Sequence, residues 1–336
     1  MCICRSVMAI AALMIFSRGI AGCQELDRPL PLEPKCVESI QKAVTQVALG
    51  KLAESEEELS AALSRVEPSA GDPCAGLILH NLATIASISG RFLDAERLAA
   101  SSIAALEKAY PADDRALWRP LMLLAGSRLE QGKKSSARAD LKRLREIRPE
   151  RPQDRALMHG TVGSLLQQLG EHREAEVEYL AALQAWEDSG LGETVDAAAV
   201  LTSLATLLIE DRRLNEARRS VDRAAAIFSQ SKDAAPMDQS KLLVVSGALH
   251  ARRREWQDAE VDFREALSIA DGQRAVDAGY ILRLVTSFAE ALNKNHHRQE
   301  GRRMEARAAA LRLASPSLDR VVDVSDLRAH PRSEKK

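Results

Sequence analysis

Hydrophobic residues recur along most of the chain at the spacing of amphipathic helices. The strand-forming residues Val, Ile, Thr and Tyr never gather into short alternating runs. Prolines fall between the periodic segments or in a first helical turn, where a missing N–H costs little. These prolines are Pro29, Pro31, Pro34, Pro68, Pro73, Pro111, Pro120, Pro149, Pro152, Pro236 and Pro316. The pattern therefore predicts an all-α chain.

The helical pattern repeats about every 42 residues. A small residue recurs at Ala43, Ala83, Ala125, Gly163, Ala205, Gly247 and Ala289. A second small residue follows twelve positions later, at Ser55, Ala95, Ala137, Ala175, Ala217, Ala259 and Gly301. Two antiparallel helices approach closely only where facing positions lack bulk. The repeat thus predicts about seven helical hairpins, each closed at two small residues.

A turn residue lies five positions before each second small residue. It is glycine in the first four repeats and a larger residue in the last three. The set is Gly50, Gly90, Gly132, Gly170, Arg212, Arg254 and His296. Glycine at this place is typical of a helix that ends in a tight turn.

Strings such as HNLATIASISGRFLDAERLAASSIAALEKAYPADD resemble tetratricopeptide repeats, in particular the longer repeats of the kinesin light chain type. The resemblance covers residues 35–313. It implies an all-α, right-handed α-solenoid of about seven hairpins, in which the first helix of each hairpin lines the concave face. It also implies a protein-binding function.

The first 23 residues have the layout of a secretory signal, with Arg5, an apolar run from Ser6 to Phe16, and small residues up to Cys23. Ile20 to Cys23 also resembles the lipobox of bacterial lipoproteins, in which Cys23 would be acylated, and ordinary cleavage nearby is the alternative. We expect export to the periplasm or to an outer-membrane anchor. Residues 24–34 form the predicted linker, and residues 314–336 a partly disordered C-terminal tail.

Only Cys36 and Cys74 remain in the predicted folded body after the signal. Each would open the first helix of a consecutive hairpin, and export would place both in an oxidising compartment. The two alternatives are a disulfide between them and two separate buried thiols.

Motifs for catalysis are missing from the sequence, which has no Gly-rich phosphate loop, His-Glu-x-x-His pair or Gly-x-Ser-x-Gly elbow. A formal charge of -1 argues against a nucleic-acid partner. Histidines are scattered over separate repeats, so we predict no metal site. The prediction is a non-enzymatic protein without catalytic residues, metal or cofactor.

The resemblance to tetratricopeptide repeats also selects candidate partner-binding residues on the concave face. These are His80, Asn81, Thr84, Ser87, Thr161, Ser164, Gln167, Gln168, Thr202, Ser203 and Thr206. Their side chains would form a neutral groove that hydrogen-bonds a peptide or a helix, and the alternative is an ordinary hydrated helix face. We expect a protein-interaction scaffold of the bacterial envelope with a protein or peptide partner. The alternatives are a lipid-anchored envelope assembly factor and an accessory subunit of an envelope enzyme.

Overall fold

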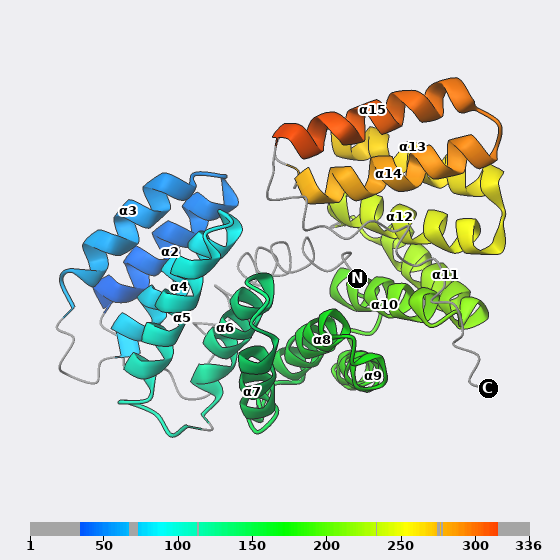
Figure 1. Ribbon diagram of the computed structural model, residues 1–336. Coiled ribbons are helices and arrows are strands. Elements are labelled where there is room, and N and C mark those ends of the chain that lie inside the picture. Colours follow the sequence, from blue (N-terminus) through cyan, green and yellow to red (C-terminus); the bar gives the residue numbers. More distant parts are fainter. Residues whose placement is uncertain are drawn as a thin grey trace, which may run out of the picture. The chain divides into compact units, whose positions relative to one another are not determined.

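Every regular element that the computed structural model describes is a helix (Figure 1). The described residues are 34–66, 73–112, 114–232, 234–273, 276 and 278–314. The predicted signal, nearly all of the predicted linker and the tail beyond residue 314 lie outside them, so cleavage or acylation at Cys23 stays a prediction. None of the described helices is long and apolar enough to cross a bilayer.

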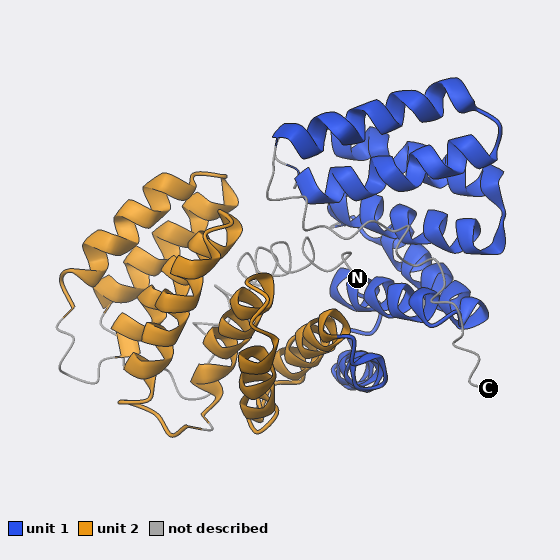
Figure 2. Cartoon of the chain, viewed as in Figure 1, with its two compact units in different colours: residues 1–6, 170–336 blue, residues 7–169 orange. Residues whose placement is uncertain are grey.

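The chain divides into two compact units (Figure 2). Unit 2 comprises Val7–Leu169. Its described helices are α2 (Pro34–Ala48), α3 (Leu52–Leu63), α4 (Pro73–Ile88), α5 (Phe92–Leu106), the short η1 (Arg115–Leu117), α6 (Trp118–Glu130), α7 (Lys134–Leu144) and α8 (Pro152–Leu169). Three hairpins, α2–α3, α4–α5 and α6–α7, precede α8.

Unit 1 comprises Met1–Ser6 and Gly170–Lys336. Its described helices are α9 (His172–Asp188), α10 (Val195–Glu210), α11 (Leu214–Gln230), α12 (Pro236–Arg253), α13 (Trp256–Asp271), α14 (Ala278–Lys294) and α15 (Arg298–Ala314). After α9 they form the hairpins α10–α11, α12–α13 and α14–α15. In each of these hairpins the predicted turn residue lies between the two helices or at the end of the first.

All fourteen small residues of the repeat are buried, and in the hairpins within each unit they lie where the paired helices meet. A Cβ atom on Gly247 of α12 would come within 2.8 Å of the Phe263 ring on α13. Ser55, which replaces the usual alanine, donates its hydroxyl to the carbonyl of Ala43 across the first hairpin at 2.8 Å. Small size at these positions is therefore what lets each pair of helices close.

The predicted turn residues all have a left-handed backbone. The φ angles are between +73° and +80° at Gly50, Gly90, Gly132 and Gly170. Arg212, Arg254 and His296 take the same conformation, with φ of 61°, 65° and 67°. A side chain makes this region unfavourable, so the last three turns are formed at an energetic cost.

Polar side chains join consecutive hairpins at a constant place, which we call the turn pair, and in four of the five turn pairs both residues are charged. One residue of a turn pair directly follows the second small residue of a hairpin. The other lies at the start of the second helix of the next hairpin. The turn pairs are Glu56–Arg91 (2.7 Å), Glu96–Lys133 (2.6 Å), Glu176–Arg213 (2.6 Å), Arg218–Glu255 (3.6 Å) and Glu260–His297 (2.7 Å). The signs are reversed in Arg218–Glu255, yet the charges remain opposite.

A second set of ion pairs, which we call end pairs, joins the C-terminal end of one second helix to the next second helix. They are Glu107–Arg143, Glu187–Arg223 at 3.0 Å and Asp271–Arg307 at 2.5 Å. Each spans 36 residues. Ion pairs at a fixed sequence separation favour one stacking register of the hairpins over others.

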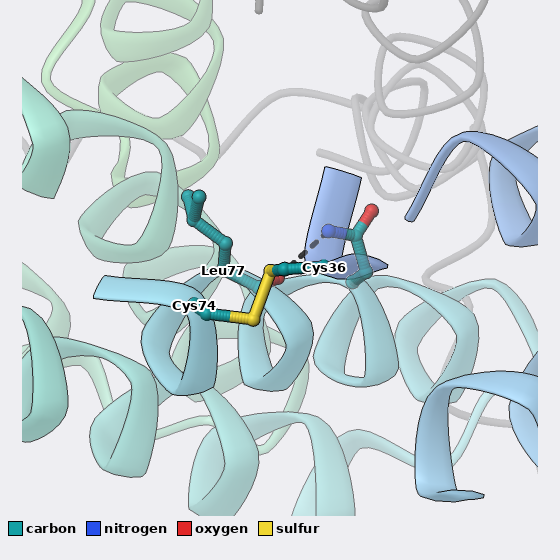
Figure 3. The surroundings of a disulfide bond; sticks show 4 residues. Cys36, Cys74 and Leu77 are labelled. Carbon is teal, nitrogen blue, oxygen red and sulfur yellow. Dashed lines mark hydrogen bonds between the residues drawn. A yellow bond between two sulfur atoms is a disulfide. The ribbon is translucent and has the colours of Figure 1, made fainter. Parts of the chain in front are cut away.

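A disulfide joins Cys36 on α2 to Cys74 on α4, with Cα atoms 6.1 Å apart (Figure 3). Of the two alternatives left open by the sequence, the structure contains the bonded pair. Both cysteines are buried in a cluster with Ala43, Leu59 and Ile78. The bond ties the first hairpin to the second.

Candidate functional site

The first helices of consecutive hairpins contact one another within each unit. In unit 2 the contacts run from α2 to α4, α6 and α8, and in unit 1 from α10 to α12 and α14. We call the side of these helices that carries the predicted partner-binding residues the inner face. Each unit has its own inner face, and a site can be built within either one.

The structure distributes the predicted residues over both units. His80, Asn81, Thr84 and Ser87 lie on α4, whereas Thr161, Ser164, Gln167 and Gln168 lie on α8. The three remaining residues, Thr202, Ser203 and Thr206, lie on α10 of unit 1. Helix α6 lies between α4 and α8 and contributes no predicted residue.

More than half of the predicted residues are buried. Buried members are Asn81, Thr84, Ser164, Gln167, Thr202 and Thr206. Half-buried members are His80, Ser87, Thr161, Gln168 and Ser203. The predicted residues of unit 2 that are not fully buried are therefore His80 and Ser87 on α4 and Thr161 and Gln168 on α8.

Hydroxyl groups of the inner face donate to their own helices. Thr84 donates to His80 O at 3.0 Å, Thr161 to Leu157 O at 2.9 Å and Thr202 to Ala198 O at 2.8 Å. Such a bond to the preceding turn uses the hydroxyl hydrogen and leaves the oxygen lone pairs as acceptors. Of these three residues only Thr161 is half-buried, so its oxygen can accept a hydrogen bond from a partner, whereas Thr84 and Thr202 are buried. Gln168 is different, because its Nε2 is buried without a hydrogen-bond partner among the described residues.

An arginine that the sequence reasoning missed organises the inner face of unit 2. Arg119 on α6 stacks over the Trp118 ring at 4.5 Å and donates to Asp154 on α8 at 3.2 Å. Burial lowers the pKa of His80 on α4 to about 3, and the charge of Arg119 adds to this effect. His80 is therefore neutral near pH 7. Asp154 follows a proline in the first turn of α8, a signal that could have pointed to a charged partner on α6.

A second polar cluster lies in unit 1, where ligand atoms of His250, Glu255 and Asp258 all lie within 4.8 Å of one another. His250 Nδ1 is 2.6 Å from Glu255 Oε2. Arg218 of α11 approaches the same imidazole, with Nη2 3.4 Å from Nδ1 and 3.6 Å from Glu255 Oε2. Because a permanent positive charge stands beside these groups, we interpret the cluster as an ion-pair network between α11 and α12–α13.

Solved structures of helical-repeat proteins share this fold. A Rap protein complexed with Competence and Sporulation Factor gives a TM-score of 0.63 at 14% identity, over 93% of this chain and 88% of the other. A tetratricopeptide repeat protein from Parabacteroides merdae gives 0.55 at 18% identity, over 85% and 97%. NprR in complex with its cognate peptide NprX gives 0.51 at 11% identity, over 93% and 81%.

No protein-family model matches the sequence, and neither does any curated protein. The structural similarity nevertheless defines the class of fold. The chain has a helical-repeat fold of the tetratricopeptide type, as the repeat in its sequence predicts.

Proposed function

We propose that this chain is a non-enzymatic scaffold that is exported to the bacterial envelope and holds a peptide or a helix of another protein. The observation that carries the proposal is the tetratricopeptide-like array with hydrogen-bonding side chains on its first helices. Unit 2 offers the better-defined inner face, because Arg119 and the accessible groups of α4 and α8 lie on three neighbouring helices.

Two of the structural neighbours support a peptide or protein partner. NprR was solved with its cognate peptide NprX, and the Rap protein with Competence and Sporulation Factor. The acceptor groups of the inner face favour a partner that brings hydrogen-bond donors, such as N–H groups of the backbone or of Asn, Gln, Lys and Arg side chains.

The disulfide supports the exported location. Structural disulfides persist in oxidising compartments such as the periplasm and are rare in the cytosol of most organisms. This agrees with the signal-like pattern of residues 1–23. The mass of the mature protein from a membrane-free periplasmic extract tests it: a chain that retains residues 1–23, or that has free thiols at Cys36 and Cys74, would contradict export.

The binding proposal is tested by crosslinking the full-length protein to its partners in the producing cell and identifying them by mass spectrometry. Ser87→Arg on the inner face of α4 is expected to reduce recovery of the specific partner by about tenfold. Ser136→Arg makes the same change on an exposed part of α7 and serves as the matched control. Equal recovery with both variants would show that the inner face of unit 2 is not the binding site.

The lipobox-like string at Ile20 to Cys23 supports a second candidate, a lipid-anchored assembly factor. Palmitate labelling of the intact protein and of Cys23→Ala separates the two candidates. Label that disappears in the variant supports the anchor, and an unlabelled intact protein excludes it. Co-purification with an envelope enzyme whose activity needs this chain would instead support the accessory-subunit role.

A further inference from the structure

The outer face of α15, the last helix that the structure describes, has the same positions through which earlier second helices contact the next hairpin. On α13 these positions are Glu260, Arg264, Leu267 and Asp271. All four are engaged by α14–α15: Glu260 pairs with His297, Arg264 with Glu300 and Asp271 with Arg307, while Leu267 is buried in the core cluster. They therefore define a stacking face.

The same four positions on α15 are Arg302, Ala306, Ala309 and Leu313. Their spacing of four, three and four residues places them on one side of the helix. All four are exposed, and Leu313 is 83% exposed. No hydrogen bond or ion pair joins Arg302 to any described residue. A solenoid end usually carries a polar outer surface, whereas this one presents a leucine in line with an arginine.

The charges on this face differ from those on the stacking faces of α5, α9 and α13. Helices α5, α9 and α13 present an acidic residue at both ends of the face, at Glu96 and Glu107, Glu176 and Glu187, and Glu260 and Asp271. Helix α15 presents Arg302 at one end and Leu313 at the other. Arg302 occupies on α15 the position that Arg218 occupies on α11, and Arg218 forms an ion pair with Glu255.

From this register we infer that the α15 face is a second docking surface, which takes a helical segment of another protein. That segment brings a carboxylate to Arg302, as Glu255 does to Arg218, and an apolar side chain to Leu313. This surface is separate from the inner faces of the first helices and independent of what they bind.

Charge also argues against a second copy of this chain as the occupant. Head-to-tail stacking would bring Lys51, the turn-pair residue of the first hairpin, to Arg302. Two-fold stacking with the helices parallel would bring Arg302 to its own equivalent, and two-fold stacking with the helices antiparallel would place it opposite Leu313 of the other copy. The first two arrangements place like charges together, which disfavours them, and none of the three supplies a carboxylate to Arg302.

The test uses a photoreactive benzoylphenylalanine in place of Leu313 in the full-length protein, with crosslinking in the producing cell and sequencing of the crosslinked peptide. We expect a helix-forming segment of another protein that contains Asp or Glu. Arg302→Glu should reduce the crosslink by about tenfold or more, whereas the control Arg303→Glu, which changes the net charge equally, should retain it. Replacing the partner's carboxylate residue with lysine should restore the crosslink to Arg302→Glu.

Three results would overturn the inference. They are no crosslinked peptide from another protein, a crosslink to residues 315–336 or to a second copy of this chain, and a crosslink that is insensitive to Arg302→Glu. Circular dichroism of each variant shows that a lost crosslink does not come from unfolding. Because Ser87→Arg changes a different surface, the crosslink from residue 313 should survive that variant.

Discussion

At the scale of single residues, the turn residues adopt the same left-handed backbone conformation at different energetic costs. Glycine occupies this position in four turns, and Arg212, Arg254 or His296 occupies it in three. The backbone conformation is the same in all seven, so the stacking of helices imposes it against the preference of the side chain.

Arg254→Gly is expected to stabilise the protein by about 0.5–1 kcal/mol, because glycine adopts this φ without a steric penalty. The converse change, Gly132→Arg, should destabilise it by about 1 kcal/mol, since nothing within 4 Å of the added Cβ complicates the comparison. Urea unfolding measures both. A destabilised Arg254→Gly variant would contradict this account.

His80 predicts a dependence of stability on pH. Its pKa is lowered from 6.5 to about 3 in the folded chain, so the unfolded chain binds more protons between these values. Stability is therefore lost as the pH falls below 6.5, by about 1–2 kcal/mol at pH 5. The difference in unfolding free energy between pH 7 and pH 5 should shrink by that amount in His80→Gln, and an unchanged difference would contradict the assignment.

At the scale of helices and hairpins, the turn pairs offset the effect of burial on the pKa of their carboxyl groups. Burial opposes ionisation of Glu96, but hydrogen bonds from Lys133, Arg128 and Gln131 hold its pKa below the usual value. Exposed ion pairs contribute little energy individually. Their constant place at successive hairpins contributes specificity of register, because a shifted stack would bring together residues that do not match.

The turn pair Arg218–Glu255, in which the signs are reversed, allows the contribution of a turn pair to stability to be measured. Arg218→Glu should destabilise unit 1 by about 1 kcal/mol, because it faces Glu255 with a like charge and removes a cation from beside His250. Adding Glu255→Arg should recover part of the loss. A double-mutant cycle in urea measures the coupling, and a coupling of zero would show that the pair does not contribute.

The disulfide is the only covalent tie between hairpins among the described residues. It closes a sequence separation of 38 residues, for which loop entropy suggests a stabilisation of about 4 kcal/mol. Cys36→Ala with Cys74→Ala should therefore lower the thermal midpoint. Hydrogen exchange should rise in α2 to α5 and stay unchanged in α12 to α15, and uniform exchange across the chain would contradict this prediction.

At the scale of the whole molecule, a helical array gains its stability from neighbouring hairpins. Ala175 and Ala217 are fully buried where helices close on each other. Ala217→Arg should destabilise unit 1 by about 1–3 kcal/mol or more, because it overfills a close contact and buries a charge. Thermal melting measures the loss, and the exposed Ala226→Arg on the same helix is the control. An unchanged midpoint for Ala217→Arg would contradict the repeat register.

The repeat could be predicted because its physical cause is local. Fourteen small positions, their separation of twelve residues and the turn residue between them reflect the closing of two adjacent helices, which any one hairpin requires. The inner-face residues could be chosen only by analogy with tetratricopeptide repeats. Arg119 was missed since its importance comes from contacts with α4 and α8, at long sequence separations.

The sequence by itself therefore determined the helices, the hairpins, their register and the tight turns, because all of these depend on side-chain size and spacing within one repeat. Only the tertiary structure decided the pairing of Cys36 with Cys74, the burial of Asn81, Thr84 and Thr206, and the network of His80, Arg119 and Asp154. It also decided that Arg302 and Leu313 stand on a stacking face that no other described helix covers. Each of these depends on how one hairpin packs against the next, and that packing is a property of the folded array.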